Sequence, residues 1–153
     1  MFIKLPNINR LSFAIQIKAP REKVWDVLWN DNSYRQWTRV FSEGSYAVSD
    51  WKEGSKVHFL SPSGDGMYST IAKSLRPELM SFKHLGVIKE GKEQPLGEES
   101  KKWSGAMENY TLREKDAGTA LTVDIDVTDE HRKYFSEVFP KALQIVKELS
   151  EKS

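Results

Sequence analysis

The broadest hydrophobic pattern in this chain is an apolar stripe at helical spacing over residues 129–151, near the C-terminus. It predicts one long amphipathic helix, whose stripe contains Tyr134, Phe135, Val138, Phe139, Ala142, Leu143, Ile145, Val146 and Leu149. A stripe this wide needs a large apolar partner, and one face of a curved antiparallel sheet is the natural candidate. Taken alone, the stripe favours ordinary core packing over a ligand pocket. Pro140 removes one helix hydrogen bond, so we expect a bend near residues 137–139.

The residues before this helix alternate between apolar and polar, which is typical of strands with one buried face. Leu11 to Ile17 forms the first such run, and Pro20 with Glu22 favours the start of a short helix. A further helical turn or two is expected over residues 34–37. Later strands are expected at residues 44–51, 56–61, 66–76, 79–88, 103–114 and 118–128. Together these elements predict an α+β fold in a single domain over residues 1–153.

Two connections stand out between the predicted strands. Residues 115–118 predict a tight hairpin. Residues 89–102 are charged, contain glycine and proline, and carry little apolar content. This segment is therefore expected to be a long surface loop and the best candidate for mobility.

Composition narrows the functional classes. The 23 Lys and Arg residues against 22 Asp and Glu give a net charge of +1, which gives no electrostatic reason to expect a nucleic-acid partner. No apolar run is long enough to insert in a membrane, and Met1 to Lys4 followed by Pro6 does not resemble a signal peptide. The absence of cysteine excludes disulfides and thiolate chemistry, and fits a cytoplasmic location.

Motifs for metal or cofactor binding are also lacking in the sequence. The three histidines, His58, His84 and His131, are far apart and show no metal-ligand spacing. There is no glycine-rich phosphate loop and no GxSxG nucleophile motif. We therefore expect neither a metal site nor a cofactor.

Several short motifs, taken in order, resemble the START-like (SRPBCC) superfamily, and in particular its branch named after the activator of the heat-shock-protein-90 ATPase. The N-terminal motif is Ile15-x-Ile17-x-Ala19-Pro20-x-x-x-Val24-Trp25-x-x-Leu28, followed by Trp37-Thr38. The later motifs are Trp51-x-x-Gly54, Pro77 before Leu79-x-x-Phe82, Tyr110-x-Leu112, Gly118-Thr119-x-Leu121 and Phe139-Pro140-x-Ala142-Leu143-x-x-Val146-Lys147. The resemblance runs from about Leu11 to the C-terminus.

This resemblance implies a helix-grip fold, in which a curved antiparallel sheet of about six to seven strands grips the C-terminal helix and two short helices close one end. It further implies an apolar small-molecule ligand, lipid-like or polyketide- and flavonoid-like, between sheet and helix. Two alternatives remain open: an enzyme of cyclase or aromatase type, and a protein-interaction module of co-chaperone type.

Successive side chains along a strand face opposite sides of a sheet. This alternation, called strand parity below, predicts which residues would line such a pocket. We expect inward side chains from Phe13, Ile15, Ile17, Val57, Phe59, Met67, Ile71, Leu75, Met80, Phe82, His84, Gly86, Ala106, Glu108, Leu121, Val123, Ile125 and Val127. The candidate ligand contacts are Phe59, Ile71, Phe82, His84, Trp103, Glu108, Tyr110, Val123, Tyr134, Phe135 and Val138. Tyr134, Phe135 and Val138 would flank the entrance, whereas Leu143, Val146 and Leu149 would anchor the helix.

Two polar residues, His84 and Glu108, interrupt this apolar inner face. If their strands pair around the loop at 89–102, the two side chains should meet. They could then act as an acid/base pair, orient a ligand, or simply satisfy each other as a buried structural pair.

Overall fold

The computed structural model describes residues 8–152. The segment that argues against a signal peptide lies largely in residues 1–7, outside the described residues. The N-terminal part consists of β1 (Ile8–Ile17), α1 (Arg21–Trp29), α2 (Asp31–Trp37) and the 3₁₀ turn η1 (Thr38–Val40). The rest consists of β2 (Tyr46–Val48), β3 (Lys56–Leu60), β4 (Gly66–Leu75), β5 (Leu79–Lys89), β6 (Lys92–Glu93), α3 (Glu98–Lys101), β7 (Met107–Lys115), β8 (Gly118–Thr128), η2 (Asp129–His131) and α4 (Arg132–Glu151).

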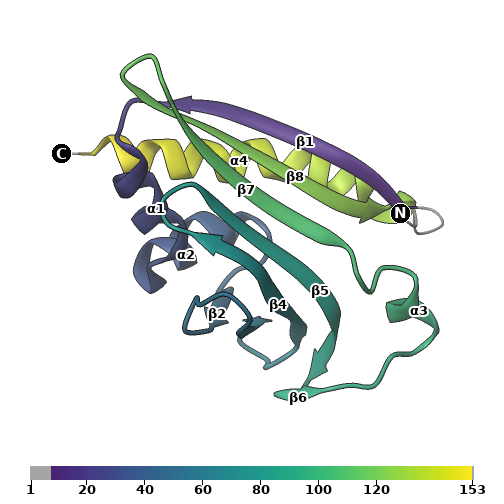
Figure 1. Ribbon diagram of the computed structural model, residues 1–153. Coiled ribbons are helices and arrows are strands. Elements are labelled where there is room, and N and C mark those ends of the chain that lie inside the picture. Colours follow the sequence, from purple (N-terminus) through teal and green to yellow (C-terminus); the bar gives the residue numbers. More distant parts are fainter. Residues whose placement is uncertain (1–7, 153) are drawn as a thin grey trace.

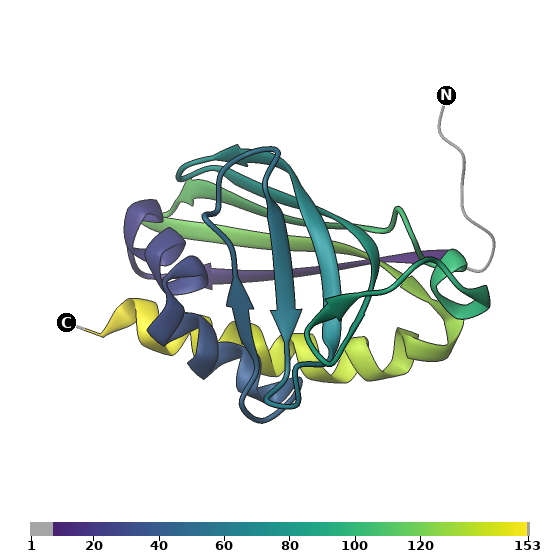
Figure 2. The ribbon, with the colours of Figure 1, turned by 90° about the horizontal axis from the view of Figure 1, so that it is seen from below.

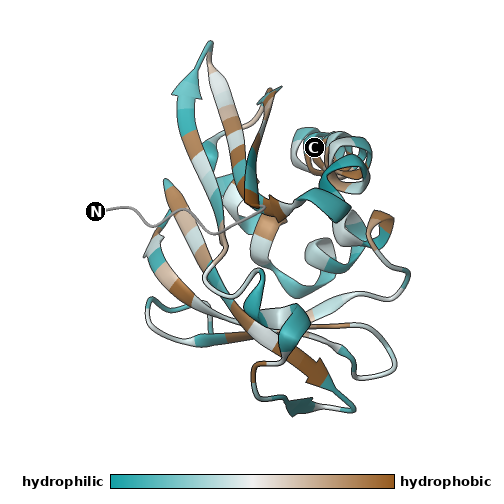
Figure 3. Ribbon diagram, turned by 90° about the vertical axis from the view of Figure 1, so that its right-hand side faces the viewer, coloured by the Kyte–Doolittle hydropathy of each residue, from teal (hydrophilic) through white to brown (hydrophobic). Residues whose placement is uncertain are grey.

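All strands join one antiparallel sheet in the order β1-β8-β7-β5-β4-β3-β2, with β6 paired to β5 outside this path. The sheet has eight strands because the two-residue β6 adds to the seven longer ones. It curves around α4, which crosses one face of the sheet (Figures 1 and 2). Figure 3 shows this curvature nearly along the α4 axis. The α+β helix-grip arrangement expected from the sequence is confirmed.

The two short helices close one end of the sheet (Figure 1). α1 begins directly after Pro20, whose carbonyl accepts from the backbone N–H groups of Lys23 and Val24 at 3.0 and 3.1 Å. Proline suits this position because its fixed φ fits the start of a helix and it lacks an N–H. The buried Trp37 indole of α2 donates to the Leu28 carbonyl at 3.0 Å, which ties the two helices together.

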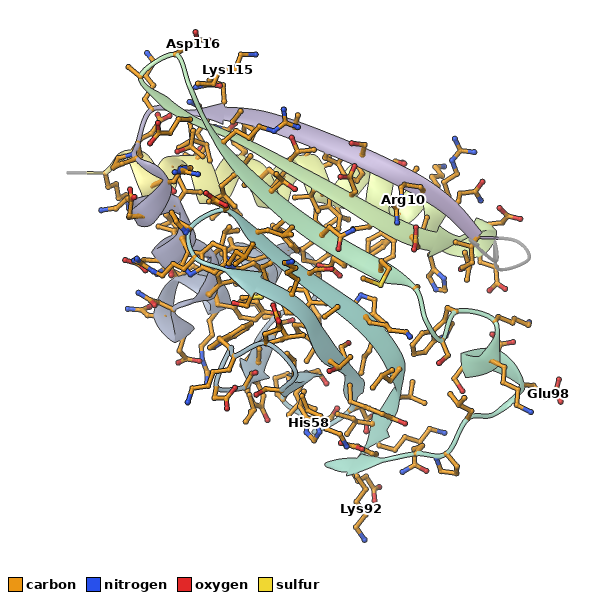
Figure 4. The ribbon with its side chains drawn as sticks, viewed as in Figure 1. Arg10, His58, Lys92, Glu98, Lys115 and Asp116 are labelled. Atoms are coloured by element: carbon orange, nitrogen blue, oxygen red, sulfur yellow. The ribbon has the colours of Figure 1, made fainter. Side chains whose placement is uncertain are left out.

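The tight hairpin predicted at residues 115–118 is present between β7 and β8. Asp116 and Ala117 have φ values of 51° and 60°, as a two-residue turn with the twist of a hairpin requires. Lys115 and Asp116 lie at its exposed tip (Figure 4).

The two halves of the long helix α4 differ in how deeply their side chains are buried. Leu143 and Val146, in its second half, are 2% and 0% exposed and belong to the core, whereas Tyr134 in its first half is 40% exposed. The α-helix begins at Arg132, because residues 129–131 form the turn η2, and it runs past Pro140 as one element. The bend at residues 137–139 stays a prediction.

Two β-bulges overturn two of the predicted inward positions. Ala72 is an extra residue in β4, between the pairs Ile71–Phe82 and Lys73–Ser81, so Leu75 is carried to the outer face, where it is 46% exposed. Leu85 is likewise extra in β5. Gly86 therefore faces Tyr68, whose ring would lie 2.7 Å from a Cβ at this position, and leaves no space in the interior.

Two predicted strands are shorter than expected. The 44–51 segment pairs only at Tyr46–Val48, and the 103–114 segment becomes a strand only at Met107. Residues 103–105 instead form turns after α3, and the expected loop 89–102 contains β6 and α3. Short polar elements of this kind carry no hydrophobic period, so the sequence pattern does not indicate them.

Candidate ligand cavity

A cavity of about 460 Å³ lies between the inner face of the sheet, the segment from α2 to residue 46, and the first half of α4. Most of its large lining side chains are aromatic: Trp29, Tyr34, Trp37, Phe41, Tyr46, Phe59, Phe82, Trp103, Tyr110, Tyr134, Phe135 and Phe139. Small-molecule sites in proteins are commonly concave spaces of roughly 300–1,000 Å³ with mainly apolar walls. The cavity is therefore of the size and character that a small organic ligand requires.

Most of the candidate contacts lie on the cavity wall: Phe59, Phe82, His84, Trp103, Glu108, Tyr110, Tyr134 and Phe135. The other three, Ile71, Val123 and Val138, do not. Ile71 and Val123 are buried in the core at 1% and 0% exposure, and Val138 is half-buried on α4. Core and wall residues look alike in a sequence, because both require apolar side chains facing inward.

Sequence reasoning missed the helical side of the wall. Tyr34 and Trp37 on α2 and Phe41 just after η1 all line the cavity, as does Phe139 on α4. The spacing of Tyr34, Trp37 and Phe41 by three and four residues is a helical signal that could have placed them on one face. Phe41 packs edge-to-face on Phe139, with ring centroids 5.0 Å apart.

The polar pair expected from strand parity is present. Nε2 of His84 lies 3.0 Å from Oε1 of Glu108, and both side chains lie on the cavity wall. The two residues are not directly opposite, because Glu108 pairs with Phe82, while the His84 N–H donates to the Ala106 carbonyl at 2.9 Å. Their contact is thus diagonal across neighbouring strands, on one face.

A third residue, Ser69 on β4, is hydrogen-bonded to the other ring nitrogen of His84. The Ser69 Oγ lies 2.6 Å from Nδ1 of His84, its one side-chain hydrogen-bond partner among residues 8–152. Because Ser69 is fully buried, the geometry suits donation of its hydroxyl proton to Nδ1. In that arrangement the Nε2–H of His84 donates to Glu108.

Glu108 accepts hydrogen bonds on both carboxylate oxygens. His84 donates to Oε1, and the Tyr110 hydroxyl donates to Oε2. An ionised carboxylate accepts on both oxygens, and the arrangement around Glu108 suits that form. Glu108 thus presents a carboxylate on the cavity wall with one donor on each of its oxygens.

Although Ser69, His84 and Glu108 are the residue types of a hydrolase triad, their arrangement does not suit nucleophilic catalysis. Ser69 is 0% exposed and does not line the cavity, so its hydroxyl cannot reach a bound substrate. Both nitrogens of His84 are occupied by protein partners, so the imidazole would have to release Ser69 or Glu108 to bind a substrate directly. The arrangement can instead orient a ligand through Glu108.

Two tyrosines next to Glu108 have perturbed acidity. Burial raises the pKa of Tyr34 well above its usual range, and the Glu108 charge raises it further. Burial and the same carboxylate also raise the pKa of Tyr110. Both phenols therefore keep their protons in the folded protein.

The raised pKa values of Tyr34 and Tyr110 in the folded protein predict a loss of stability at alkaline pH. Unfolded tyrosines ionise near pH 10, whereas these two remain protonated when folded, so the free energy of unfolding should fall as the pH rises above about 10. Each buried phenol contributes up to about 1.4 kcal/mol per pH unit. Urea unfolding between pH 8 and 11 should show a shallower fall for Tyr34→Phe than for the wild type. Parallel curves for the two proteins would contradict this assignment.

One side of the cavity lies where α4 meets the segment after η1. The Tyr134 hydroxyl donates to the Phe41 carbonyl at 2.8 Å, and the Phe135 ring packs between Tyr134 and Phe139, with ring centroids 5.2 and 6.0 Å away. Tyr134 and Phe135 thus line the cavity, and their place beside its entrance stays a prediction.

Within residues 8–152, no group of three or more His, Asp or Glu side chains is arranged to hold a metal ion. The same part of the chain contains no helix long and apolar enough to cross a membrane.

The curved sheet, the gripped helix and the aromatic cavity between them define a helix-grip domain of the START-like class. The family model described as "Activator of Hsp90 ATPase homolog 1-like protein" matches residues 18–151, and the chain belongs to this family. A search of curated proteins finds no match.

Solved structures show the same fold at low sequence identity. The Aha1 dimer from Colwellia psychrerythraea is 17% identical with a TM-score of 0.67, over 94% of this chain and 97% of that one. CalU16 from Micromonospora echinospora is 17% identical with a TM-score of 0.63, over 93% and 76% of the two chains. DynU16, a protein in the dynemicin biosynthetic locus, is 12% identical with a TM-score of 0.68, over 94% and 47%.

Proposed function

We propose that this protein binds a small, largely apolar molecule in the cavity between its sheet and α4. The observation that carries this proposal is a space of about 460 Å³ whose mainly aromatic wall is interrupted by the His84–Glu108 pair. Aromatic side chains supply most of the binding area in such sites, while a few polar groups fix the orientation of the ligand. The similar fold of DynU16, from a biosynthetic locus, is consistent with a small organic ligand.

The two alternative functions receive less support. An acid/base enzyme that used the His84–Glu108 pair would need His84 to exchange a proton with substrate, and both His84 nitrogens are already bound to Ser69 and Glu108. A co-chaperone-type surface would need a contiguous exposed apolar patch. Among the described residues 8–152, the large exposed hydrophobic side chains are Val48 on β2, Leu75 on β4, Tyr134 on α4 and Leu96 in the segment between β6 and α3. A binding role in the cytoplasm remains our preferred proposal.

A chemical-shift titration of the ¹⁵N-labelled protein with a panel of lipids, sterols and flavonoid-like compounds tests this proposal. For at least one compound, we expect saturable shifts clustered on wall residues such as Phe59, Trp103 and Phe135. Ala106→Leu adds bulk at a buried wall position and should weaken binding about tenfold or more. Ala14→Leu, the same change on the exposed face of β1, should leave binding unchanged.

The proposal would be contradicted if no compound produced clustered shifts. It would also be contradicted if Ala106→Leu, with its melting temperature near that of the wild type, bound every compound equally well.

A further inference from the structure

The charges on the cavity wall are of one sign. Among the described residues 8–152, no lysine or arginine lines the cavity, whereas Asp65, Glu108 and Asp126 do. Asp126 is paired with Arg10, whose Nε lies 3.0 Å from Oδ1, and also accepts from the Met107 N–H at 2.9 Å. Asp65 is exposed and accepts from the Glu90 N–H at 2.9 Å. Glu108 therefore differs from the other two, because it faces the cavity from a largely buried position without a cation.

The donors to Glu108 stabilise its charge but do not neutralise it. Ser69 and Glu108 between them occupy both ring nitrogens of His84, and the Tyr110 phenol donates to the carboxylate and keeps its own proton. The Glu108 side chain is only 22% exposed, so water solvates it poorly. A carboxylate removed from water favours an opposite charge within a few ångströms.

Aromatic rings lie close to Glu108: Tyr110 donates to its carboxylate and Phe82 is its partner on β5, while Ile125 is its partner on β8. Tyr110 packs edge-to-face on Trp29, with centroids 4.9 Å apart, and lies 6.3 Å from the Trp37 ring centroid. All three rings line the cavity, as does Tyr34. Aromatic faces attract cations through their quadrupoles, so they favour an ammonium group over an anion of the same size.

We propose that the ligand of this cavity carries a protonated amine on an apolar body, with the amine held against the Glu108 carboxylate. This inference rests on the proposed function and narrows it to one chemical class. The apolar body fills the aromatic part of the cavity, and the ammonium group donates to the carboxylate oxygens. Fatty acids and other apolar carboxylates are disfavoured, because their charge would meet Glu108 with no lysine or arginine on the wall to compensate it.

Calorimetric titration at pH 7 with three matched probes tests the charge preference: naphthylethylamine, naphthylethanol and naphthylacetate. The probes share one ring system and differ mainly in the polar group. We expect the amine to bind about ten- to a hundredfold more tightly than the alcohol, as a charge-assisted hydrogen bond would provide, and the acetate to bind most weakly.

Glu108→Gln removes the charge while keeping the shape, so it should abolish the preference for the amine and still bind the alcohol. Retained alcohol binding also shows that the variant is folded. Glu114→Gln makes the same change on the same strand at an exposed position outside the cavity, and should keep the preference.

The results separate this inference from the proposed function. Equal affinities for amine and alcohol, or tightest binding of the acetate, would overturn the amine assignment while leaving a small-molecule site. A preference for the amine that survives in Glu108→Gln would also overturn it. If the wild type bound none of the three probes, and no compound of the wider panel, both proposals would fall.

Discussion

Replacing Leu143 with alanine is expected to lower the free energy of unfolding by about 2–5 kcal/mol. Leu143 is 2% exposed and lies in the half of α4 that packs in the core. The truncation removes buried methyl groups and leaves a space that the packed sheet and helix cannot fill. Urea unfolding followed by circular dichroism gives the change directly.

Leu75→Ala is the matched control, since it makes the same change at a leucine that is 46% exposed. We expect a loss of about 1 kcal/mol or less, as is usual for surface substitutions. Comparing the two variants also tests the bulge at Ala72. If Leu75 pointed inward, Leu75→Ala would lower the free energy of unfolding as much as Leu143→Ala does. Equal losses for the two variants would therefore contradict the assigned register.

Gly118→Ala is expected to destabilise the protein by about 3 kcal/mol, toward the upper end of the range for steric overpacking. Gly118 begins β8, where a Cβ would lie 2.3 Å from the Ile17 carbonyl oxygen. The obstacle is a backbone atom, so relief requires the ends of β1 and β8 to separate where these two strands pair. Thermal and urea unfolding should both show the loss.

Gly97→Ala serves as its control, because no atom lies within 4 Å of a Cβ at Gly97, where φ is −110°. Its stability should remain within about 0.5 kcal/mol of the wild type. If the two alanine variants were equally stable, the close approach at Gly118 would be wrong.

The elements that could be predicted from the sequence are those whose burial repeats over many residues. The apolar stripe of α4 repeats over several helical turns, and the apolar–polar alternation of β1 and β8 repeats along most of each strand. Both periods are therefore visible in the sequence. The bulges at Ala72 and Leu85 leave no such mark, because one extra residue shifts the parity without changing composition. For this reason, simple alternation along the strands predicts Leu75 and Gly86 on the inner face, whereas both lie on the outer face.

The candidate site could be predicted only in part for related reasons. His84 and Glu108 were brought together because no bulge separates them within the β5–β7 pairing, so parity alone was enough. The contact with Ser69 depends on the shifted register between β4 and β5, which the sequence does not reveal. The cavity itself follows from how side chains pack, and an apolar pattern is the same whether it encloses space or fills it.

The pairing of β5 with β7 restricts where the length of this chain can change during evolution. One residue gained or lost between Phe82 and His84 would turn His84 to the opposite face, away from Glu108. The exposed segment between β6 and α3 has no such constraint, because its residues lie outside the β5–β7 pairing. Insertions and deletions among relatives should therefore accumulate in this segment, a short way along the chain before the cavity residue Trp103, while the polar pair stays in place.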